Sequence, residues 1–314
     1  MAPGPPRAEP IGADTSRSPF DAVVFAGGGC RCFWQAGFYA VAAPALGITP
    51  ERIGAVSAGA AFACAALLDA TDEVLSDFKR RTARNPRNAY PRNLLRGDRV
   101  FPHESMYRGA VLTGLAAGDL RRLRGGPDLR ILLARTPRWA GDRLGFAIGG
   151  FAYALDRYEL RVHARWGLRF GFEAEVVSAR ECGDAAALTE LILQSSCTPP
   201  LLPRYRRDGR LVLDGGLIDN APADFVGDAR STLVLLTRDY PGGRIPSRPG
   251  RTYAVPSEPI PIVKWDYTSP DLIQQTFDLG RRDGEAFARR HPTSAPSVVR
   301  STGHNRGEDR RLAG

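Results

Sequence analysis

Short, continuous apolar runs alternate along the chain with longer segments of helical length. Runs with the length of buried strands lie at residues 22–26, 52–56, 129–134, 170–178, 211–213 and 232–237, and helical segments lie at 33–46, 58–70 and 185–196. Pro44 is expected to end the first helix at or near its own position. Apolar strands separated by crossover helices are typical of a parallel sheet that is covered on both faces. The pattern therefore predicts one α/β domain, a three-layer α/β/α sandwich around a mainly parallel sheet.

The two ends of the chain differ from its middle. Residues 1–19 are rich in Pro, Gly and Ser, and residues 291–314 are polar and charged with only scattered Val and Leu. Such segments bury too little apolar surface to offset the entropy cost of ordering, so we expect two disordered tails. Residues 20–290 then form the folded domain. Within it, residues 79–127 are rich in Arg, Gly and Pro, and we expect them to form helices and loops that act as a cap or as a membrane-facing region.

The composition is that of an ordinary globular protein. A chain of 314 residues that is 43% hydrophobic and 25% charged is not collagen-like, low-complexity or wholly disordered. No run approaches the roughly 18 apolar residues of a transmembrane helix, and the N-terminus lacks the apolar region of a secretory signal. The five cysteines are odd in number and lie mostly in apolar or small-residue runs. This usage indicates reduced thiols in a cytoplasmic protein.

The net charge of +9 comes almost entirely from arginine, because Lys79 and Lys264 are the only lysines. Residues 79–99 carry eight cations and a single acid, Asp98. Two interpretations explain such a segment equally well: a solvated surface, or peripheral contact with an anionic membrane. We expect no nucleic-acid partner, because no zinc finger, recognition helix or RNA-binding aromatic pattern accompanies the charge.

Ser57 lies at the junction between a predicted strand and a small-residue helix, in the sequence Ala55-Val56-Ser57-Ala58-Gly59. A serine on a sharp strand-to-helix turn projects its hydroxyl from the top of the sheet, and the residues two before and two after it must be small. Ala55 and Gly59 meet that requirement. The same motif, taken alone, fits a serine that caps a buried helix.

Two further segments place polar groups after strands. Gly27, Gly28 and Gly29 follow the first strand and precede Cys30 and Arg31, so their amides could receive an oxyanion. A dinucleotide loop is less favoured, because the last glycine of that motif is replaced by cysteine. A tight turn is the simpler alternative.

The other segment is Asp214-Gly215-Gly216, in which small neighbours allow a second loop to approach a carboxylate that could act as a base. By itself, this tripeptide more often marks a turn. Asp219 and Asn220, which follow shortly after it, are candidates to anchor the turn by bonding to the local backbone.

In this order, the three segments resemble the patatin-like phospholipase family, which is marked by a G-G-G-x-R-G loop, a G-x-S-x-G elbow and a D-G-A or D-G-G segment. The resemblance covers residues 20–240 and includes the stretch Gln194 to Pro200. It implies that Ser57 is the nucleophile and that Asp214 is its partner in a catalytic dyad. It also implies an oxyanion hole formed by Gly28, Gly29, Cys30 and Arg31, supported by Gly27, Ala55, Gly59, Gly215 and Gly216. Two positions depart from the motifs, since Ala55 and Cys32 replace glycines.

The resemblance implies a lipid acyl hydrolase that acts on phospholipids or lysophospholipids without a metal or organic cofactor. An aspartate is a weak base, so an ester suits the dyad better than an amide. The motifs leave open an acyltransferase or a small-ester esterase with the same dyad, and a degenerate relative that binds lipid without cleaving it. A triad with His291 or His304 is also open, but both lie in or near the polar tail. Aromatic residues between 139 and 166 fit either a lid or ordinary packing.

Overall fold

The computed structural model describes residues 18–291, except positions 160, 164, 239 and 241–243. The two expected tails therefore lie almost wholly outside the described residues. The described strands are β1 (Ala22–Phe25), β2 (Arg52–Val56), β3 (Asp128–Arg135), β4 (Glu173–Ser178), β5 (Tyr205–Arg207), β6 (Arg210–Asp214), β7 (Thr232–Leu235) and β8 (Arg251–Ala254). The helices are α1 (Phe33–Leu46), α2 (Ala58–Leu67), α3 (Thr71–Ala83), α4 (His103–Ala117), α5 (Arg121–Gly125), α6 (Asp142–Glu159), α7 (Trp166–Arg169), α8 (Ala185–Ser195) and α9 (Pro270–Arg290).

The strands form one eight-stranded mixed sheet in the order β5-β6-β3-β2-β1-β7-β8, with β4 also paired to β3. The central pairings β3-β2, β2-β1, β1-β7 and β7-β8 are parallel. The pairings of β4 and β6 with β3, and of β5 with β6, are antiparallel. The predicted α/β fold around a mainly parallel sheet is therefore confirmed.

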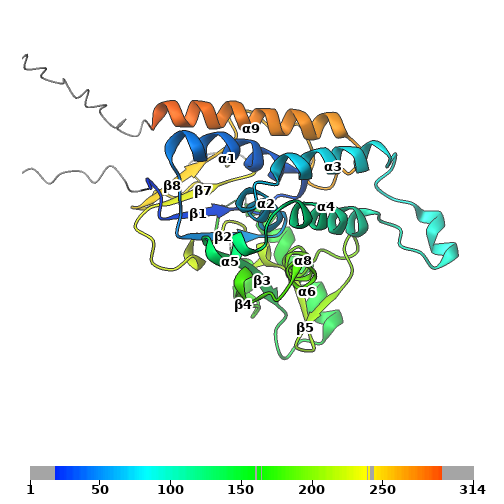
Figure 1. The fold of residues 1–314 in the computed structure, drawn as a ribbon. Helices are drawn as coiled ribbons and strands as arrows, with labels where there is room; N and C mark the ends of the chain where they lie inside the picture. The colour runs from blue at the N-terminus through cyan, green and yellow to red at the C-terminus, as the bar shows by residue number, and fades with distance from the viewer. Residues whose placement is uncertain (1–17, 160, 164, 239, 241–243, 292–314) are drawn as a thin grey trace, which may run out of the picture.

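Alternate residues of the central strands face two separate apolar clusters. Val23 and Phe25 of β1 join the larger cluster, which includes residues of α1 and α9, and Figure 1 shows these two helices together over one side of the sheet. Val24 and its neighbour Val234 on β7 join a smaller cluster, which residues 221–226 help to form. Both faces of these strands are buried, which explains why their sequences are apolar throughout.

Some element boundaries differ from the sequence prediction. Helix α1, in contrast, has the predicted bounds, Phe33–Leu46, with Pro44 two residues before its end. The strand predicted from residue 170 begins only at Glu173, because the chain first closes helix α7. Gly171 has a φ of +83°, and the amide of Phe172 donates a hydrogen bond back to the carbonyl oxygen of Gly167. Only after this turn can the chain become extended.

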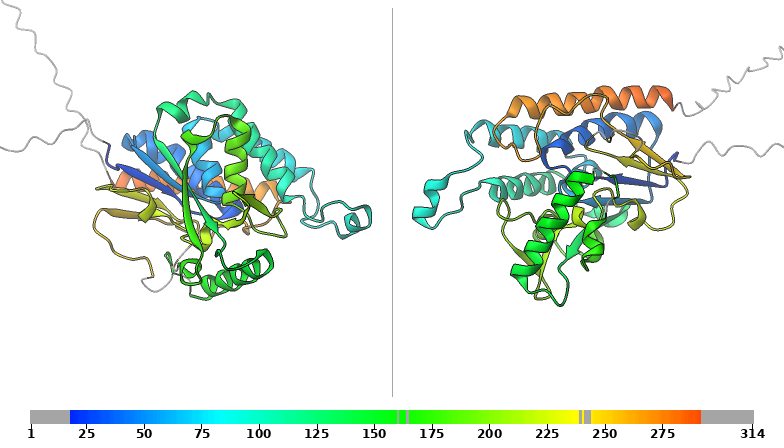
Figure 2. Two further views of the ribbon diagram at one scale, coloured as in Figure 1. Left: turned by 90° about the horizontal axis from the view of Figure 1, so that it is seen from below. Right: turned by 180° about the vertical axis from the view of Figure 1, so that it is seen from behind.

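The basic region forms helices and one projecting loop. Helices α3 and α4 lie side by side, and residues 84–102 between them form an arm that extends from the domain in all three views (Figures 1 and 2). A short 3-10 helix, Pro91–Arg96, lies in this arm. No helix among the described residues is long and apolar enough to cross a membrane.

Candidate active site

Strand register brings Ser57 and Asp214 together. Val56, the last residue of β2, lies opposite Leu132 of β3, and Asp214, the last residue of β6, lies opposite Leu133. Strand β6 thus pairs with the end of β3, beyond the end of β2. Ser57 follows Val56 directly, so its side chain reaches the same edge of the sheet. The Ser57 hydroxyl donates a hydrogen bond of 2.8 Å to Asp214 Oδ2.

Ser57 sits on a strained backbone turn. Its φ of 55° and ψ of −138° lie outside the regions that a residue with a side chain ordinarily adopts. The turn is held by Ser195, whose hydroxyl accepts a hydrogen bond from the Ser57 amide at 2.9 Å and donates one to the carbonyl oxygen of Leu132 at 2.7 Å. A Cβ at Gly59 would lie 2.5 Å from the carbonyl oxygen of Phe25, so this position requires glycine.

The position two residues before the serine accepts a methyl group. Ala55, which stands where the family motif has glycine, is completely buried in strand β2 between Phe25 on β1 and Ile131 on β3. The closest approach near the nucleophile is made instead at Gly59, whose hypothetical Cβ would lie 2.5 Å from the carbonyl oxygen of Phe25. Gly54 is also tightly packed, but against Val226, whose Cγ1 would lie 2.5 Å from a Cβ at that position.

Asp214 is buried and has defined partners for both carboxylate oxygens. Oδ2 accepts from the Ser57 hydroxyl, and Oδ1 accepts from the Gly216 amide at 2.8 Å. Burial raises the pKa of Asp214, while the nearby Lys264 ammonium, the Gly216 amide and the Ser57 hydroxyl oppose this rise. A carboxylate with a raised pKa is a stronger base than an exposed aspartate.

The glycine loop lies beside this pair and is held by the chain that follows Asp214. The Gly27 amide donates to the carbonyl oxygen of Asn220 at 2.9 Å. The Gly27 carbonyl oxygen accepts from Asn220 Nδ2 at 3.1 Å and from Thr237 Oγ1 at 2.7 Å. Among the described residues, no hydrogen bond is made by the amides of Gly28 and Gly29. These two amides are available to a ligand.

The other two residues of the predicted oxyanion hole use their amides within the protein. The Cys30 amide donates to the carbonyl oxygen of Lys264 at 3.0 Å, and the Arg31 amide donates to that of Gly28 at 3.3 Å. Cys30 and Cys32 are buried, and burial raises the pKa of both thiols. Such thiols remain protonated at neutral pH and are poor nucleophiles.

A cavity of about 260 Å³ opens at the glycine loop and Asp214. Phe146 and Tyr153 of α6 and the segment from Cys197 to Leu201 form part of its lining. Of the aromatic residues between 139 and 166, these two thus lie in the cavity wall, whereas Trp139 and Phe151 are exposed. Helix α6 therefore forms one wall of the candidate active site.

The described histidines bond to groups other than the dyad. His291 Nδ1 contacts the carbonyl oxygen of Phe287 in its own helix, and His103 Nε2 contacts that of Trp265. His163 Nδ1 lies 2.9 Å from the Asp219 carboxylate. His304 lies outside the described residues. Within the described part of the chain, the partner of the Ser57 hydroxyl is Asp214 alone, and no cluster of three His, Cys, Asp or Glu residues could hold a metal.

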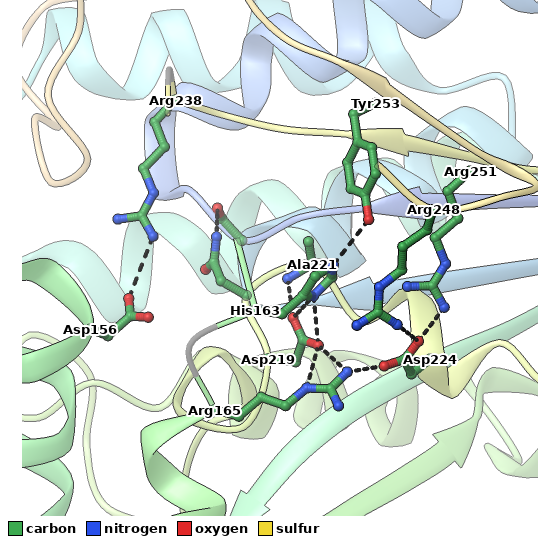
Figure 3. A network of polar contacts seen from close by, with 12 residues as sticks. Asp156, His163, Arg165, Asp219, Ala221, Asp224, Arg238, Arg248, Arg251 and Tyr253 are labelled. Atoms are coloured by element: carbon green, nitrogen blue, oxygen red, sulfur yellow. Dashed lines mark hydrogen bonds and ion pairs between the residues drawn. The ribbon is translucent and has the colours of Figure 1, made fainter. Parts of the chain in front are cut away.

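Asp219 stabilises the loop that carries Asn220. Its carboxylate accepts from the Ala221 amide at 2.9 Å, as expected for a residue that anchors the local turn, and it also pairs with Arg165 and His163 (Figure 3). The side chain of Asn220, in contrast, reaches away from the local backbone to Gly27. The Asp219 network thus supports the loop that fixes the start of the glycine segment.

Sequence reasoning missed three residues that support the site: Ser195 as the partner of the Ser57 amide, Thr237 as a donor to Gly27, and Lys264 in the cavity wall. Ser195 lies in the stretch from Gln194 to Pro200 that belongs to the resemblance, but no local pattern shows which group it bonds, and Thr237 ends an apolar run that looks like ordinary core. Lys264 could have been noticed, since lysine occurs only twice in the chain.

Comparison with known proteins agrees with the motifs. Residues 23–226 match the family model described as patatin-like phospholipase. A comparison with curated proteins finds no match. The solved structures that match include the crystal structure of VipD from Legionella pneumophila, at 12% sequence identity and a TM-score of 0.44, with coverage of 87% of this chain and 67% of that chain.

Proposed function

The chain belongs to the patatin-like phospholipase family and is a lipid ester hydrolase, and on this premise we propose that it cleaves phospholipids or lysophospholipids with a dyad of Ser57 and Asp214. The observation that carries this proposal is the hydrogen bond of 2.8 Å from the Ser57 hydroxyl to Asp214 Oδ2. It joins a nucleophile and a base that are far apart in the sequence. Asp214 lines the same cavity as Gly28, and a Cβ at Gly27 would lie 3.4 Å from Ser57 Cβ.

The dyad provides a complete proton path for ester cleavage. Ser57 Oγ attacks the acyl carbon while its proton passes to Asp214 Oδ2. As the tetrahedral intermediate collapses, the ester C–O bond breaks and Asp214 returns the proton to the oxygen of the departing alcohol. Water then attacks the acyl-serine and gives one proton to Asp214, and Ser57 recovers that proton when the fatty acid leaves.

Gly28 and Gly29 are the proposed donors to the oxyanion. The negative charge on the former carbonyl oxygen needs fixed N–H groups, and one such donor is worth about 10²- to 10³-fold in kcat in other hydrolases. The hydrogen bonds of Cys30 and Arg31 within the protein suit these residues to hold the loop in shape while Gly28 and Gly29 face the substrate.

A fluorophosphonate probe tests the nucleophile, because it reacts with an activated serine irrespective of the lipid. We expect the wild type to be labelled, Ser57→Ala to be unlabelled, and Asp214→Asn to be labelled about 10²- to 10⁴-fold more slowly, as for loss of a general base. A folded wild type that is not labelled would support lipid binding without catalysis. Release of fatty acid from a lysophospholipid, with and without an added alcohol acceptor, separates hydrolysis from acyl transfer.

We also propose that the arm, residues 84–102, contacts an anionic membrane surface. The 3-10 helix Pro91–Arg96 lies at the outer end of the arm (Figure 1). Its residues Leu94 and Leu95 have 69% and 89% of their surfaces exposed, and Arg92 and Arg96 of the same helix are exposed as well. Burial of each leucine in a lipid interface contributes roughly 1.5–3 kcal/mol, and each arginine adds about 1 kcal/mol near anionic lipid. Lipid would thus cover an apolar tip that water now surrounds.

The basic residues before the arm are less suited to this contact. Lys79 donates to Gln274, and Arg80 and Arg81 both pair with the buried Asp77. Charge reversal at Arg80 or Arg81 would disturb the fold as well as any lipid contact. The lipid contact is therefore assigned to the arm rather than to the whole segment from 79 to 99.

Vesicle co-sedimentation tests the arm. We expect Leu94→Ser/Leu95→Ser and Arg92→Glu/Arg96→Glu to lose binding to vesicles that contain phosphatidylserine, with the second effect weaker at high salt. Leu144→Ser is the matched control, since Leu144 is a half-exposed leucine on α6, away from the arm. Equal binding by the wild type and both arm variants would exclude the proposed contact.

A further inference from the structure

Lys264 places an ammonium group in the wall of the active-site cavity. The same cavity is lined by Asp214 and by Gly28 of the proposed oxyanion hole. The chain has only two lysines, and Lys264 lies beyond residues 23–226, the part that matches the family model. This cation is thus a feature that the C-terminal part of the chain adds to the site.

The Lys264 ammonium has no hydrogen bond or ion pair with any of the described residues. It lies 5.3 Å from the centre of the Tyr153 ring and 4.9 Å from that of Trp265. The other lysine, Lys79, bonds to Gln274 Oε1 at 2.7 Å. Aromatic faces attract a cation but leave its three N–H groups without acceptors. An ammonium in such a setting is poised for an anionic ligand.

The backbone around Lys264 is fixed relative to the glycine loop. The Lys264 carbonyl oxygen accepts from the Cys30 amide at 3.0 Å, and the next carbonyl, that of Trp265, contacts His103 Nε2 at 3.0 Å. The Tyr267 carbonyl oxygen accepts from Asn85 Nδ2 at 2.8 Å. The lysine is therefore anchored at the site and does not reach it by chance from a loose loop.

The other charged groups among the described residues of the cavity form no ion pair with the Lys264 ammonium. Arg31 and Arg238 lie in the wall as well, but neither is without a partner, and Arg238 pairs with Asp156 at 3.5 Å (Figure 3). Both oxygens of Asp214 are hydrogen-bonded, to Ser57 and Gly216. Much of the remaining wall is apolar, including Phe146, Leu201 and Leu217. A ligand that fills this cavity thus needs an apolar part and one anionic group near the reacting serine.

We propose that Lys264 is a specificity-determining residue that binds the phosphate group of the lipid substrate. The inference rests on the proposed hydrolysis of phospholipids or lysophospholipids by Ser57. In these lipids the phosphate lies a few bonds from the scissile ester, as Lys264 lies near the dyad. The ammonium donates hydrogen bonds to the phosphate oxygens while the acyl chain occupies apolar wall. Lipid esters without phosphate make no use of this contact.

The test compares two substrates with the same acyl chain, a lysophospholipid and a monoacylglycerol. For Lys264→Met we expect kcat/KM on the lysophospholipid to fall about 10- to 100-fold, as for loss of a hydrogen bond to a charged group, mainly through a higher KM. The change on the monoacylglycerol should stay within about threefold. Lys264→Arg should restore most of the preference, and Lys79→Met, the matched control at the other lysine, should behave as the wild type.

Equal loss on both substrates would overturn the inference. Lys264 would then act through Asp214, and the pH profile on both substrates would shift together.

A binding experiment tests the phosphate contact separately from hydrolysis. In the Ser57→Ala background, an ether-linked lysophospholipid should bind more weakly when Lys264 is changed to Met, whereas an alkylglycerol of equal chain length should not. Identical affinities would reject phosphate binding even if the enzyme cleaves lipid, and failure of the wild type to cleave either ester would reject the proposed hydrolysis alone.

Discussion

Substitution of Ser195 by alanine tests how the strained nucleophile turn is held. Ser195 is completely buried, and its hydroxyl bridges the Ser57 amide, at 2.9 Å, and the Leu132 carbonyl oxygen, at 2.7 Å. Alanine fits the space but removes this bridge. The Ser57 amide then has no partner in a region that water does not reach.

The cost follows from the two bonds that are lost. A buried donor left without a partner costs about 1–3 kcal/mol, and an ordinary hydrogen bond contributes about 0.5–1.5 kcal/mol. We therefore expect Ser195→Ala to lower the free energy of unfolding by roughly 2–4 kcal/mol. Activity should fall as well, because the backbone of Ser57 at φ 55° is held in place by its surroundings and relaxes when one of them is removed.

Urea unfolding measures the stability change, and the rate of fluorophosphonate labelling measures the position of Ser57. Thr189→Val is the matched control, since Thr189 is a buried residue of the same helix α8, and its hydroxyl donates to the carbonyl oxygen of Ala185 within that helix. The control should lose at most about 1 kcal/mol and should label normally. If Ser195→Ala is as stable as Thr189→Val and labels at the wild-type rate, the bridge does not hold the turn.

Three further predictions concern the base, the turn and the glycine loop. Burial raises the pKa of Asp214, so esterase activity should rise as the pH increases through that raised pKa. Because the folded state then binds this proton more tightly than the unfolded chain, stability should fall over the same interval, and thermal melts of Asp214→Asn should lack this dependence. Gly59→Ala places a Cβ 2.5 Å from a carbonyl oxygen and should destabilise by about 1–3 kcal/mol or more in urea, whereas Gly141→Ala, with open space, should be nearly neutral. Thr237→Val removes the donor of the 2.7 Å bond to Gly27 and should slow fluorophosphonate labelling with little change in circular dichroism.

The sequence alone is enough to predict features that depend on residues close to one another along the chain. The apolar runs predicted β1 and β2 because both faces of these strands are buried, and β2 was predicted with the bounds that the structure has, Arg52–Val56. The sequence could also have predicted the ion pairs of Arg80 and Arg81. Asp77 lies three and four residues before them, a spacing that brings side chains together on a helix. That spacing predicts that both arginines pair with Asp77 and are not free to contact a membrane.

Contacts between distant segments were beyond the sequence. The family resemblance implies that Ser57 and Asp214 form a pair. The physical reason that they meet is that β6 runs antiparallel to the end of β3 and stops opposite Leu133. A shift of that pairing by one residue would turn Asp214 to the other face of the sheet. The position of Lys264 depends on a similar long-range contact, since its carbonyl oxygen accepts from the Cys30 amide more than 200 residues earlier in the chain. The chemistry of the site thus depends most on strand pairings and backbone contacts between distant segments, which local sequence patterns encode least. For this reason, substitutions in β6 that alter its register should abolish labelling of Ser57 even when the motif residues are intact.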